Sequence, residues 1–314
     1  MILVTGGAGF IGSYLVKYFV ERGEEVAVID NLSSGNYELI RKFVEDGHVK
    51  FYKGDLRNEK DCEKALEGVS EVYHLAANPE VRLGATSPNV DFENNIVATY
   101  NLLEGMRKHG IKDIVFTSTS AVYGDAEVIP TPEEYPLKPI SIYGATKAGC
   151  ESLLNAYSHT FDFNALIFRF ANVVGPGLTH GVIYDFVRKL MKNPKELEIL
   201  GDGTQTKSYL HVEDCVEAML YVKKKFAGGC EVYNIGSEDW INVKRIAEIV
   251  VEEMGLKNVK FKFTGGYGGR GWRGDVKLMR LSIDKIKATG WKPKYNSEDS
   301  VRLAARDVIK SLVD

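Results

Sequence analysis

Short apolar runs alternate with helical patterns along the chain up to Asn172. Each run is short and bounded by turn-forming residues, so the runs are predicted to be strands, at residues 2–4, 26–29, 49–52, 71–75, 114–117 and 166–171. Between them, residues 13–20, 61–67 and 94–107 have apolar positions at helical spacing. Strands that alternate with helices in this way predict an α/β fold, with a doubly wound parallel sheet covered by helices on both faces.

The rhythm changes after Asn172, where Gly175-Pro176-Gly177 interrupts the chain. Helices are predicted at 183–191, 242–254 and 300–312 and a short strand at 197–201, while 209–222 and 232–235 are expected to return to the main sheet. These patterns predict a smaller C-terminal lobe interleaved with the sheet domain. The sheet domain is expected to comprise residues 1–171 plus about 208–236, and the lobe residues 172–207 plus about 237–314.

Composition narrows the class of protein. The chain has 314 residues and a net charge of −3, so no basic excess favours nucleic acid or an anionic membrane. Its four cysteines lack the close spacing of a zinc site or redox motif and are expected to be thiols in a reducing compartment. The first residues have the pattern of a strand rather than a signal peptide, and no apolar run approaches the roughly 18 residues of a membrane span. We therefore expect a cytoplasmic protein without a metal site.

Three glycines lie between the first predicted strand and the first helix. Gly6, Gly9 and Gly12, with Phe10 and Ile11 between the last two, suit a tight turn, a close backbone approach to a pyrophosphate and close helix packing. The helix N-terminus then faces the negative charge. The alternative is a loop that only turns the chain and binds nothing. The strand–turn–helix context favours the pyrophosphate-binding turn over this alternative. The pattern predicts a Rossmann-type dinucleotide-binding domain.

The end of the second predicted strand selects the dinucleotide. Asp30 lies 18 residues after Gly12, where a carboxylate holds the adenosine ribose hydroxyls. A carboxylate there repels a 2′-phosphate, and the residues that follow, with Asn31 and Ser33 among them, offer no cation to bind one. The sequence therefore favours NAD over NADP.

Two further strand ends are candidates for contact with the cofactor. Asp55, followed by Leu56, is placed either to hydrogen-bond the adenine amino group or to cap a turn. Leu75, Ala76 and Ala77 end the fourth strand with small residues, as a strand beside a cofactor does, although core packing explains them equally well.

A tyrosine and a lysine four residues apart are the candidate chemical groups. Tyr143 and Lys147 share a face if residues 143–160 form a helix. A nearby ammonium and a cationic nicotinamide ring would favour the phenolate of Tyr143, which then takes a proton from a hydroxyl as hydride leaves carbon. The hydroxyl cluster at residues 117–120 ends the fifth strand, at the edge of the sheet where ligands bind.

Together these motifs resemble the extended short-chain dehydrogenase/reductase superfamily over nearly the full chain, and within it the UDP-glucose (UDP-galactose) 4-epimerase family. The resemblance is carried by residues 6–12, 30–33, 54–56, 74–77, 94–95, 118–124, 143–147, 169–175, 201–212 and 274–275. It implies that Thr119 is the catalytic hydroxyl, Tyr143 the base and Lys147 its lysine, with Thr119 and Tyr143 also touching the substrate. It further implies that Asn95 lies by the cofactor, with Tyr143 and Lys147, and that Asn172 binds the substrate's diphosphate.

The resemblance also separates this chain from related dehydratases. Those enzymes carry Thr-Asp-Glu where this chain has Thr119-Ser120-Ala121, and the acid they use to expel water is missing here. Simple oxidation and reduction without elimination therefore fits better.

Candidate substrate residues lie in the predicted lobe. The glycine-rich segment 265–275 carries Arg270 and Arg273, of which Arg270 is favoured for the diphosphate, and Asp275, which suits a ribose hydroxyl. Lys207 stands where the family usually has arginine; it keeps the charge but loses the forked guanidinium. Met279 replaces a residue that gates bulky sugar substituents in many relatives, so the sugar is left open between glucose/galactose, N-acetylated and uronic forms.

Three functions stay open at this point. The first is NAD-dependent epimerisation at C4 of a UDP-hexose through a transient 4-keto sugar. The second is a net NAD-dependent dehydrogenase of the same superfamily, and the third is an NAD-binding sensor without activity. The resemblance also implies a homodimer that pairs helices 94–107 and 143–160, with a UDP-sugar as the small-molecule partner.

Overall fold

The computed structural model describes residues 1–313, which divide into two compact units. Unit 1 comprises Met1–Val122, Ile142–Arg169 and Lys223–Tyr233. Unit 2 comprises Tyr123–Ser141, Phe170–Val222 and the chain from Asn234 onward. None of the helices in residues 1–313 combines the length and the apolar character that a membrane crossing requires.

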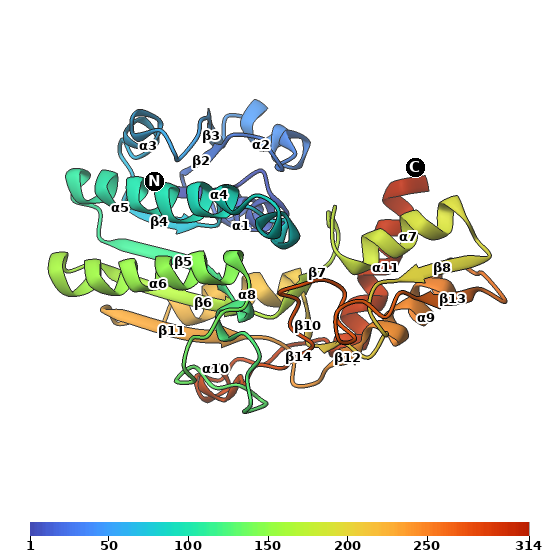
Figure 1. The fold of residues 1–314 in the computed structure, drawn as a ribbon. Helices are drawn as coiled ribbons and strands as arrows, with labels where there is room; N and C mark the ends of the chain where they lie inside the picture. The colour runs from blue at the N-terminus through green and yellow to red at the C-terminus, as the bar shows by residue number, and fades with distance from the viewer. Residues whose placement is uncertain (314) are drawn as a thin grey trace. The chain divides into compact units, whose positions relative to one another are not determined.

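A seven-stranded parallel sheet forms the centre of unit 1, in the order β11-β6-β5-β4-β1-β2-β3 (Figure 1). Its strands are β1 (Ile2–Thr5), β2 (Val26–Asp30), β3 (Val49–Lys53), β4 (Glu71–His74), β5 (Asp113–Thr119), β6 (Asn164–Phe170) and β11 (Cys230–Ile235). The six strands predicted before Asn172 are confirmed, and so is the doubly wound α/β fold.

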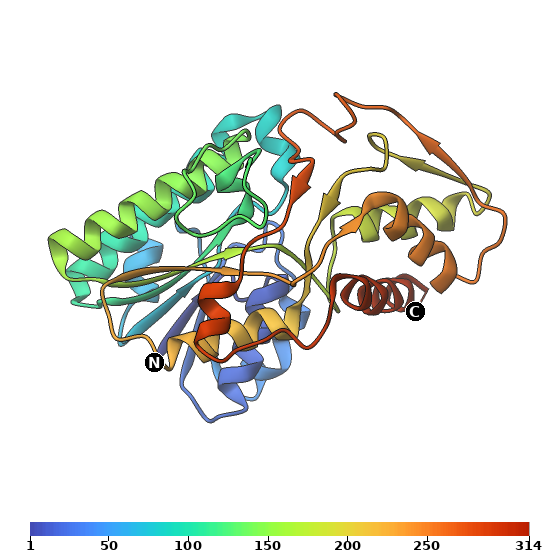
Figure 2. The same ribbon diagram turned by 90° about the horizontal axis from the view of Figure 1, so that it is seen from below.

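Helices cover both faces of this sheet, and in Figure 2 the adjacent pair α5 (Ala98–His109) and α6 (Ile142–Phe161) lies on one of them. Leu102 of α5 and Leu154 of α6 share a buried cluster with Leu3 of β1. Val4, the next residue of β1, is also fully buried but faces α1 (Phe10–Val20) on the opposite side, because successive strand residues point to opposite faces. Each fully buried leucine stabilises the fold by about 2 kcal/mol relative to exposure. The shorter helices of the unit are α2 (Arg41–Glu45), α3 (Glu59–Ala65) and α4 (Pro88–Asp91).

Unit 2 combines short strands with helices, three of which pack together. Its strands are β7 (Asn172–Val174), β8 (Glu196–Ile199), β9 (Thr206–Lys207), β10 (Tyr209–His211), β12 (Ile241–Asn242), β13 (Lys260–Phe263) and β14 (Leu278–Met279). Its helices are α7 (Val182–Lys192), α8 (Val212–Lys223), α9 (Val243–Glu253), α10 (Asp284–Ala288) and α11 (Ser297–Val313). The predicted helices 183–191, 242–254 and 300–312 are therefore confirmed as α7, α9 and α11, which contact one another.

Residues 209–222 do not return to the main sheet, so that expectation is wrong. The first three residues form β10, which pairs with β7 in a separate two-stranded sheet, and α8 follows directly. Acidic residues Glu213 and Asp214 occupy the first turn of α8, where they complement the helix dipole and favour a helix over a strand. Residues 232–235 do join the main sheet, as part of β11.

The division into units differs from the predicted one at residues 123–141 and 208–222, which belong to unit 2. Thr131 shows why for the first segment. Its amide donates to the carbonyl of Arg280, and its carbonyl accepts from the amide of Ser282 and the side chain of Asn234. All three partners lie more than a hundred residues later, beyond the reach of a local pattern.

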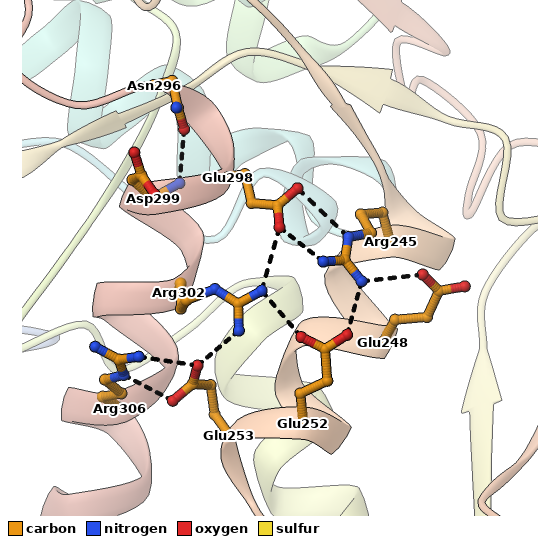
Figure 3. Close-up of polar contacts among 9 residues, drawn as sticks. All are labelled: Arg245, Glu248, Glu252, Glu253, Asn296, Glu298, Asp299, Arg302 and Arg306. Atoms are coloured by element: carbon orange, nitrogen blue, oxygen red, sulfur yellow. Dashed lines mark hydrogen bonds and ion pairs between the residues drawn. The ribbon is translucent and has the colours of Figure 1, made fainter.

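Ion pairs hold α11 against α9 in unit 2 (Figure 3). Arg245 of α9 binds Glu298 of α11 at 2.7 Å, and Arg302 of α11 reaches back to Glu253 of α9 at 2.7 Å. The remaining members of the network are Glu248, Glu252 and Arg306. Single exposed ion pairs contribute little to stability, but here each of the two central arginines serves several carboxylates, so the network fixes one register between the helices.

Candidate active site

The glycine turn before α1 is too tight for side chains. Gly6 has φ +67°, and a Cβ there would lie 2.9 Å from the Cα of Ala76 at the end of β4. A Cβ on Gly12 would lie 2.2 Å from the carbonyl oxygen of Gly6. Gly9 caps α1 without a side-chain hydrogen bond, so the first turn of the helix offers its backbone N–H groups. The turn is therefore a cradle of backbone atoms, as a pyrophosphate site requires.

Asp30 ends β2 and organises the loop beside this turn. Its two carboxylate oxygens accept from the amides of Ala8, at 3.1 Å, and Leu32, at 2.8 Å. Burial raises the pKa of its carboxyl despite these two bonds. Because a carboxylate has about four lone-pair sites, Asp30 keeps acceptor capacity for ribose hydroxyls.

Asp55 caps its own turn. Its carboxylate accepts from the amide and the guanidinium of Arg57 and, at 3.0 Å, from the side chain of Asn31. The hydrogen bonds from Arg57 lower the pKa of Asp55 to about 2. The turn-capping alternative is thus present in the structure, whereas the contact with adenine stays a prediction.

A buried hydrogen-bond chain fixes the ends of β1 and β4. The hydroxyl of Thr5 accepts from the amides of Leu75 and Ala76, both at 3.1 Å, and lies 2.7 Å from Nδ1 of His74. With both lone pairs of Thr5 used, its proton points to Nδ1, so Nε2 of His74 carries the ring proton and donates to Thr99 at 3.0 Å. His74 is therefore a structural residue, and it sets the backbone beside the glycine turn.

This histidine makes unit 1 sensitive to acid. Burial, together with the ammonium of Lys147, lowers the pKa of His74 from 6.5 to about 3, so the folded chain stays neutral where the unfolded chain binds a proton. The contribution of neutral His74 to the free energy of unfolding is fully present above pH 6.5. It is lost as the pH falls toward 3, by about 5 kcal/mol in all. Between pH 7.5 and pH 5, urea unfolding is expected to show a loss of stability that is about 2 kcal/mol larger in the wild type than in His74→Gln. A His159→Gln control, at an exposed position of α6, keeps the loss; the same loss in His74→Gln would contradict the assignment.

The three candidate catalytic residues lie on β5 and α6, both in unit 1. Lys147 is 2% exposed, and its ammonium donates to the carbonyl oxygen of Thr117 at 2.8 Å and lies over the ring of Phe116. Thr119 ends β5, and its hydroxyl accepts from the amide of Ala121 at 3.2 Å. Tyr143 stands in the first turn of α6, half-buried.

In the chain without cofactor, burial governs the pKa values of Tyr143 and Lys147. Burial, followed by the carboxylate of Asp91 and the thiol of Cys150, raises the pKa of Tyr143, where the sequence argument expected the ammonium to lower it. Burial lowers the pKa of Lys147 to about 8. Burial is the main cause in both cases, and Asp91, the acid near Tyr143, is one that the sequence analysis did not single out.

That acid, Asp91, is the last residue of α4 and directly precedes a π-helical segment, Phe92–Val97. Asp91 is fully buried; one carboxylate oxygen accepts from Asn78 at 2.8 Å, and the other has no hydrogen-bond partner within residues 1–313. Asn95 donates to Thr146 at 2.9 Å, while its own side-chain oxygen is likewise buried without a partner. π-helical turns are rare and occur frequently at functional sites, and an orphaned acceptor suits a bound group.

Four predicted substrate residues come from unit 2. Lys207 lies 2.6 Å from a carboxylate oxygen of Asp275, and Arg270 donates at 2.6 Å to the backbone carbonyl of Asp275. The side chain of Asn172 donates to the carbonyl of Ser208, the residue after Lys207. Unit 2 therefore brings the predicted residues into one neighbourhood.

Sequence reasoning missed the partner of Arg270. Both ends of its guanidinium bind the carboxylate of Asp125, each at 2.9 Å. Arg273 instead lies over the ring of Tyr267, 5.0 Å from its centre, which leaves Arg270 as the arginine beside Lys207 and Asp275. A diphosphate that takes the fork of Arg270 has to displace Asp125 or share the arginine with it. Among residues 1–313 no group of acids, histidines and cysteines is arranged to hold a metal ion.

The fold and the glycine turn define the class: an NAD-binding protein of the extended short-chain dehydrogenase/reductase type. A family model described as the NAD dependent epimerase/dehydratase family matches residues 2–236. The chain therefore belongs to this family, its cofactor is NAD, and the predicted superfamily is confirmed.

Individual relatives agree with this assignment. A UDP-glucose 4-epimerase of Corynebacterium glutamicum is 31% identical and covers 81% of this chain and 80% of its own length. A crystal structure of a UDP-galactose 4-epimerase is 46% identical, with a TM-score of 0.88 and 99% of both chains covered. The UDP-glucose 4-epimerase of Thermotoga maritima, solved with UDP-glucose, is 34% identical with the same TM-score and the same coverage.

Proposed function

We propose that this protein is a UDP-glucose 4-epimerase, which interconverts UDP-glucose and UDP-galactose. The observation that carries the proposal is the end of β5 beside α6. Thr119 is followed by Ser120 and Ala121, which supply no acid to expel water, while Tyr143 and Lys147 supply proton transfer and charge. These groups suit oxidation and reduction at one carbon without elimination.

In the proposed reaction, Tyr143 takes the proton of the sugar's O4 hydroxyl as the C4–H bond breaks and a C4=O bond forms. Thr119 donates a hydrogen bond to the same oxygen, and Lys147 stabilises the phenolate of Tyr143. The 4-keto sugar then turns about its diphosphate, and Tyr143 returns the proton to O4 as hydrogen is added to the other face of C4. When bound, NAD supplies the acceptor and donor of the hydride, so no net oxidation results.

The residues of unit 1 fit this cofactor. The backbone cradle of Gly6, Gly9 and Gly12 suits the pyrophosphate, and the carboxylate of Asp30 suits the adenosine ribose. The orphaned oxygen of Asn95 is a further acceptor for the bound group. We assign cofactor contacts to Phe10, Ile11, Asn31, Ser33, Asp55, Leu56, Leu75, Ala76, Ala77, Tyr143 and Lys147 as part of the same proposal.

We assign the nucleotide end of the substrate to unit 2. Arg270 and Lys207 provide positive charge for the diphosphate, Asn172 an amide donor and Asp275 an acceptor for a ribose hydroxyl.

We also propose a homodimer through α5 and α6. Tyr100 on α5 is 47% exposed and Phe92, in the π-helical segment before α5, is 51% exposed, so both supply apolar surface for such an interface. All four cysteines are free thiols, in keeping with the cytoplasmic location that we expect. Sedimentation equilibrium tests the dimer, and the double variant Phe92→Ser/Tyr100→Ser is expected to shift it to monomer.

The reaction is tested with purified protein, UDP-galactose and no added cofactor. Chromatography is expected to show conversion to UDP-glucose, while NADH absorbance in the same tube stays constant. Steady NADH production without UDP-glucose would identify a net dehydrogenase instead. Parallel reactions with UDP-N-acetylglucosamine and UDP-glucuronic acid measure the sugar preference, and faster turnover of either one would replace the proposed substrate. A chain that turns over none of these sugars yet retains NAD would be a binding protein only.

A further inference from the structure

A buried charged network lies one helical turn beyond Lys147 on α6. Glu151 of α6 accepts a hydrogen bond from the hydroxyl of Ser118 on β5, and its carboxylate also binds the guanidinium of Arg169 on β6. The closest contact of the ion pair is 2.6 Å, and a further bond from Nε of Arg169 measures 3.1 Å. Both charged side chains are 6% exposed. The network therefore joins two neighbouring strands and one helix inside unit 1.

The spacing along α6 links this network to the chemistry. Tyr143, Lys147 and Glu151 are four residues apart in turn, so they share one face of the helix. Lys147 binds the carbonyl of Thr117, and Glu151 binds the side chain of Ser118, the next residue of β5. Two successive residues of the strand are thus tied to two successive turns of the helix. Thr119 is the next residue of β5, so these two bonds fix its position as well.

Stability alone does not explain a buried ion pair here. Taking two charges out of water is costly, and apolar residues of similar size are often as stable or more so. The network also satisfies its own polar groups: the carboxylate has donors on both strands, and the guanidinium meets it through two nitrogens. Such a fully connected pair selects one arrangement of the surrounding elements, which apolar packing would leave less defined.

We propose that Ser118, Glu151 and Arg169 are positioning residues for the reaction. They hold the hydroxyl of Thr119 at a fixed place relative to that of Tyr143, so that both reach one sugar oxygen. The inference rests on the proposed function, since it takes Thr119 and Tyr143 as the groups that touch the substrate. None of the three residues is expected to touch substrate itself, so each acts through the strand and helix it joins.

Two variants test this role. Ser118→Ala removes one hydrogen bond and keeps the ion pair, and Glu151→Met/Arg169→Met replaces the pair by apolar side chains of similar length, which avoids a lone buried charge. Both are expected to lower kcat about tenfold to a hundredfold, since a displacement of about 1 Å has effects of this size. KM for UDP-galactose and the NAD content are expected to stay unchanged. A melting temperature equal to that of the wild type in the double variant, with kcat still low, separates positioning from stability.

A matched control lies on the same helix. Tyr157 of α6 donates to Glu104 of α5 at 2.6 Å, away from the strand ends, and Tyr157→Phe is expected to lower the melting temperature without changing kcat. Hydrogen exchange of the peptide covering residues 113–123 provides a second readout that needs no activity. It is expected to rise in both network variants and to match the wild type in Tyr157→Phe.

The outcomes are distinguishable from failure of the proposed function. A wild type inert toward UDP-sugars, or full activity in Tyr143→Phe, would remove the proposed reaction, and exchange in residues 113–123 would still test the positioning. If the wild type is active and Tyr143→Phe is not, wild-type kcat in Ser118→Ala and in the double variant would overturn the inference. Restoration of kcat by the apolar pair alone would show that the network serves only packing, and would overturn it as well.

Discussion

Replacement of Tyr143 by phenylalanine is expected to lower kcat by about a thousandfold, because the variant lacks the hydroxyl that exchanges a proton with the sugar oxygen. Positioned proton transfer contributes about 10² to 10⁴ to a rate, and the expected loss lies in the middle of that range; no nearby acid is placed to substitute for the tyrosine. Ser120 and Ala121 supply none, and Asp91 is buried behind the tyrosine. NAD is expected to stay bound.

The raised pKa of Tyr143 also predicts how activity depends on pH. In the chain alone, burial and the carboxylate of Asp91 favour the phenol. Positive charge nearby, from Lys147 and from a cationic cofactor ring, is then what makes proton removal favourable. Activity should therefore fall on the acid side of the pH profile, and Asp91→Asn is expected to extend activity to lower pH by removing a negative charge.

Turnover of UDP-galactose and the NAD released on denaturation are measured on the same preparation of Tyr143→Phe. Tyr157→Phe on the same helix serves as the matched control and is expected to retain full turnover. Activity of Tyr143→Phe within threefold of the wild type would sink the assignment of the base. Loss of NAD together with activity would instead give Tyr143 a role in holding the cofactor.

Site residues that belong to short sequence motifs could be predicted from the sequence. Gly6 and Gly12 serve a turn within seven residues, and Asp30 lies 18 residues after Gly12, where the dinucleotide-binding motif places an acid, so the motif reveals them. Tyr143 and Lys147 share a helix face for the same reason. These residues could be proposed for a cofactor and a reaction before any coordinates.

Groups joined across long stretches of chain were missed. Asp125 meets Arg270 145 residues later, and Glu151 meets Ser118 33 residues earlier and Arg169 18 residues later. No local period marks such partners, because their positions depend on the order of strands and on tertiary packing. Asp91 was missed for a related reason: it ends a short helix with an ordinary pattern, and both its burial and the π-helical segment that follows it are properties of the packed structure.

The cofactor site provides the second large effect. Gly12→Ala is expected to weaken NAD binding about a hundredfold, because the new Cβ would lie 2.2 Å from the carbonyl oxygen of Gly6. Neither atom is at the end of a flexible side chain, so the turn itself has to move. There is little room on the side of β4, where even a Cβ added to Gly6 would lie 2.9 Å from the Cα of Ala76. Overpacking of this kind costs about 1–3 kcal/mol, and a turn that moves to relieve it loses its fit to the pyrophosphate by a comparable amount.

Gly105→Ala on α5 is the matched control, because its Cβ would lie 2.6 Å from the outer methyl carbon of Leu66, which can rotate away. Calorimetric titration with NAD and thermal unfolding with and without NAD are measured for both variants. Gly105→Ala is expected to bind NAD like the wild type, whereas Gly12→Ala is expected to lose most of the stabilisation that NAD confers. Wild-type affinity in a folded Gly12→Ala would mean that the pyrophosphate does not lie on this turn. The role given to Asp30 would then fail with it, because Asp30 was assigned from its place beside this turn.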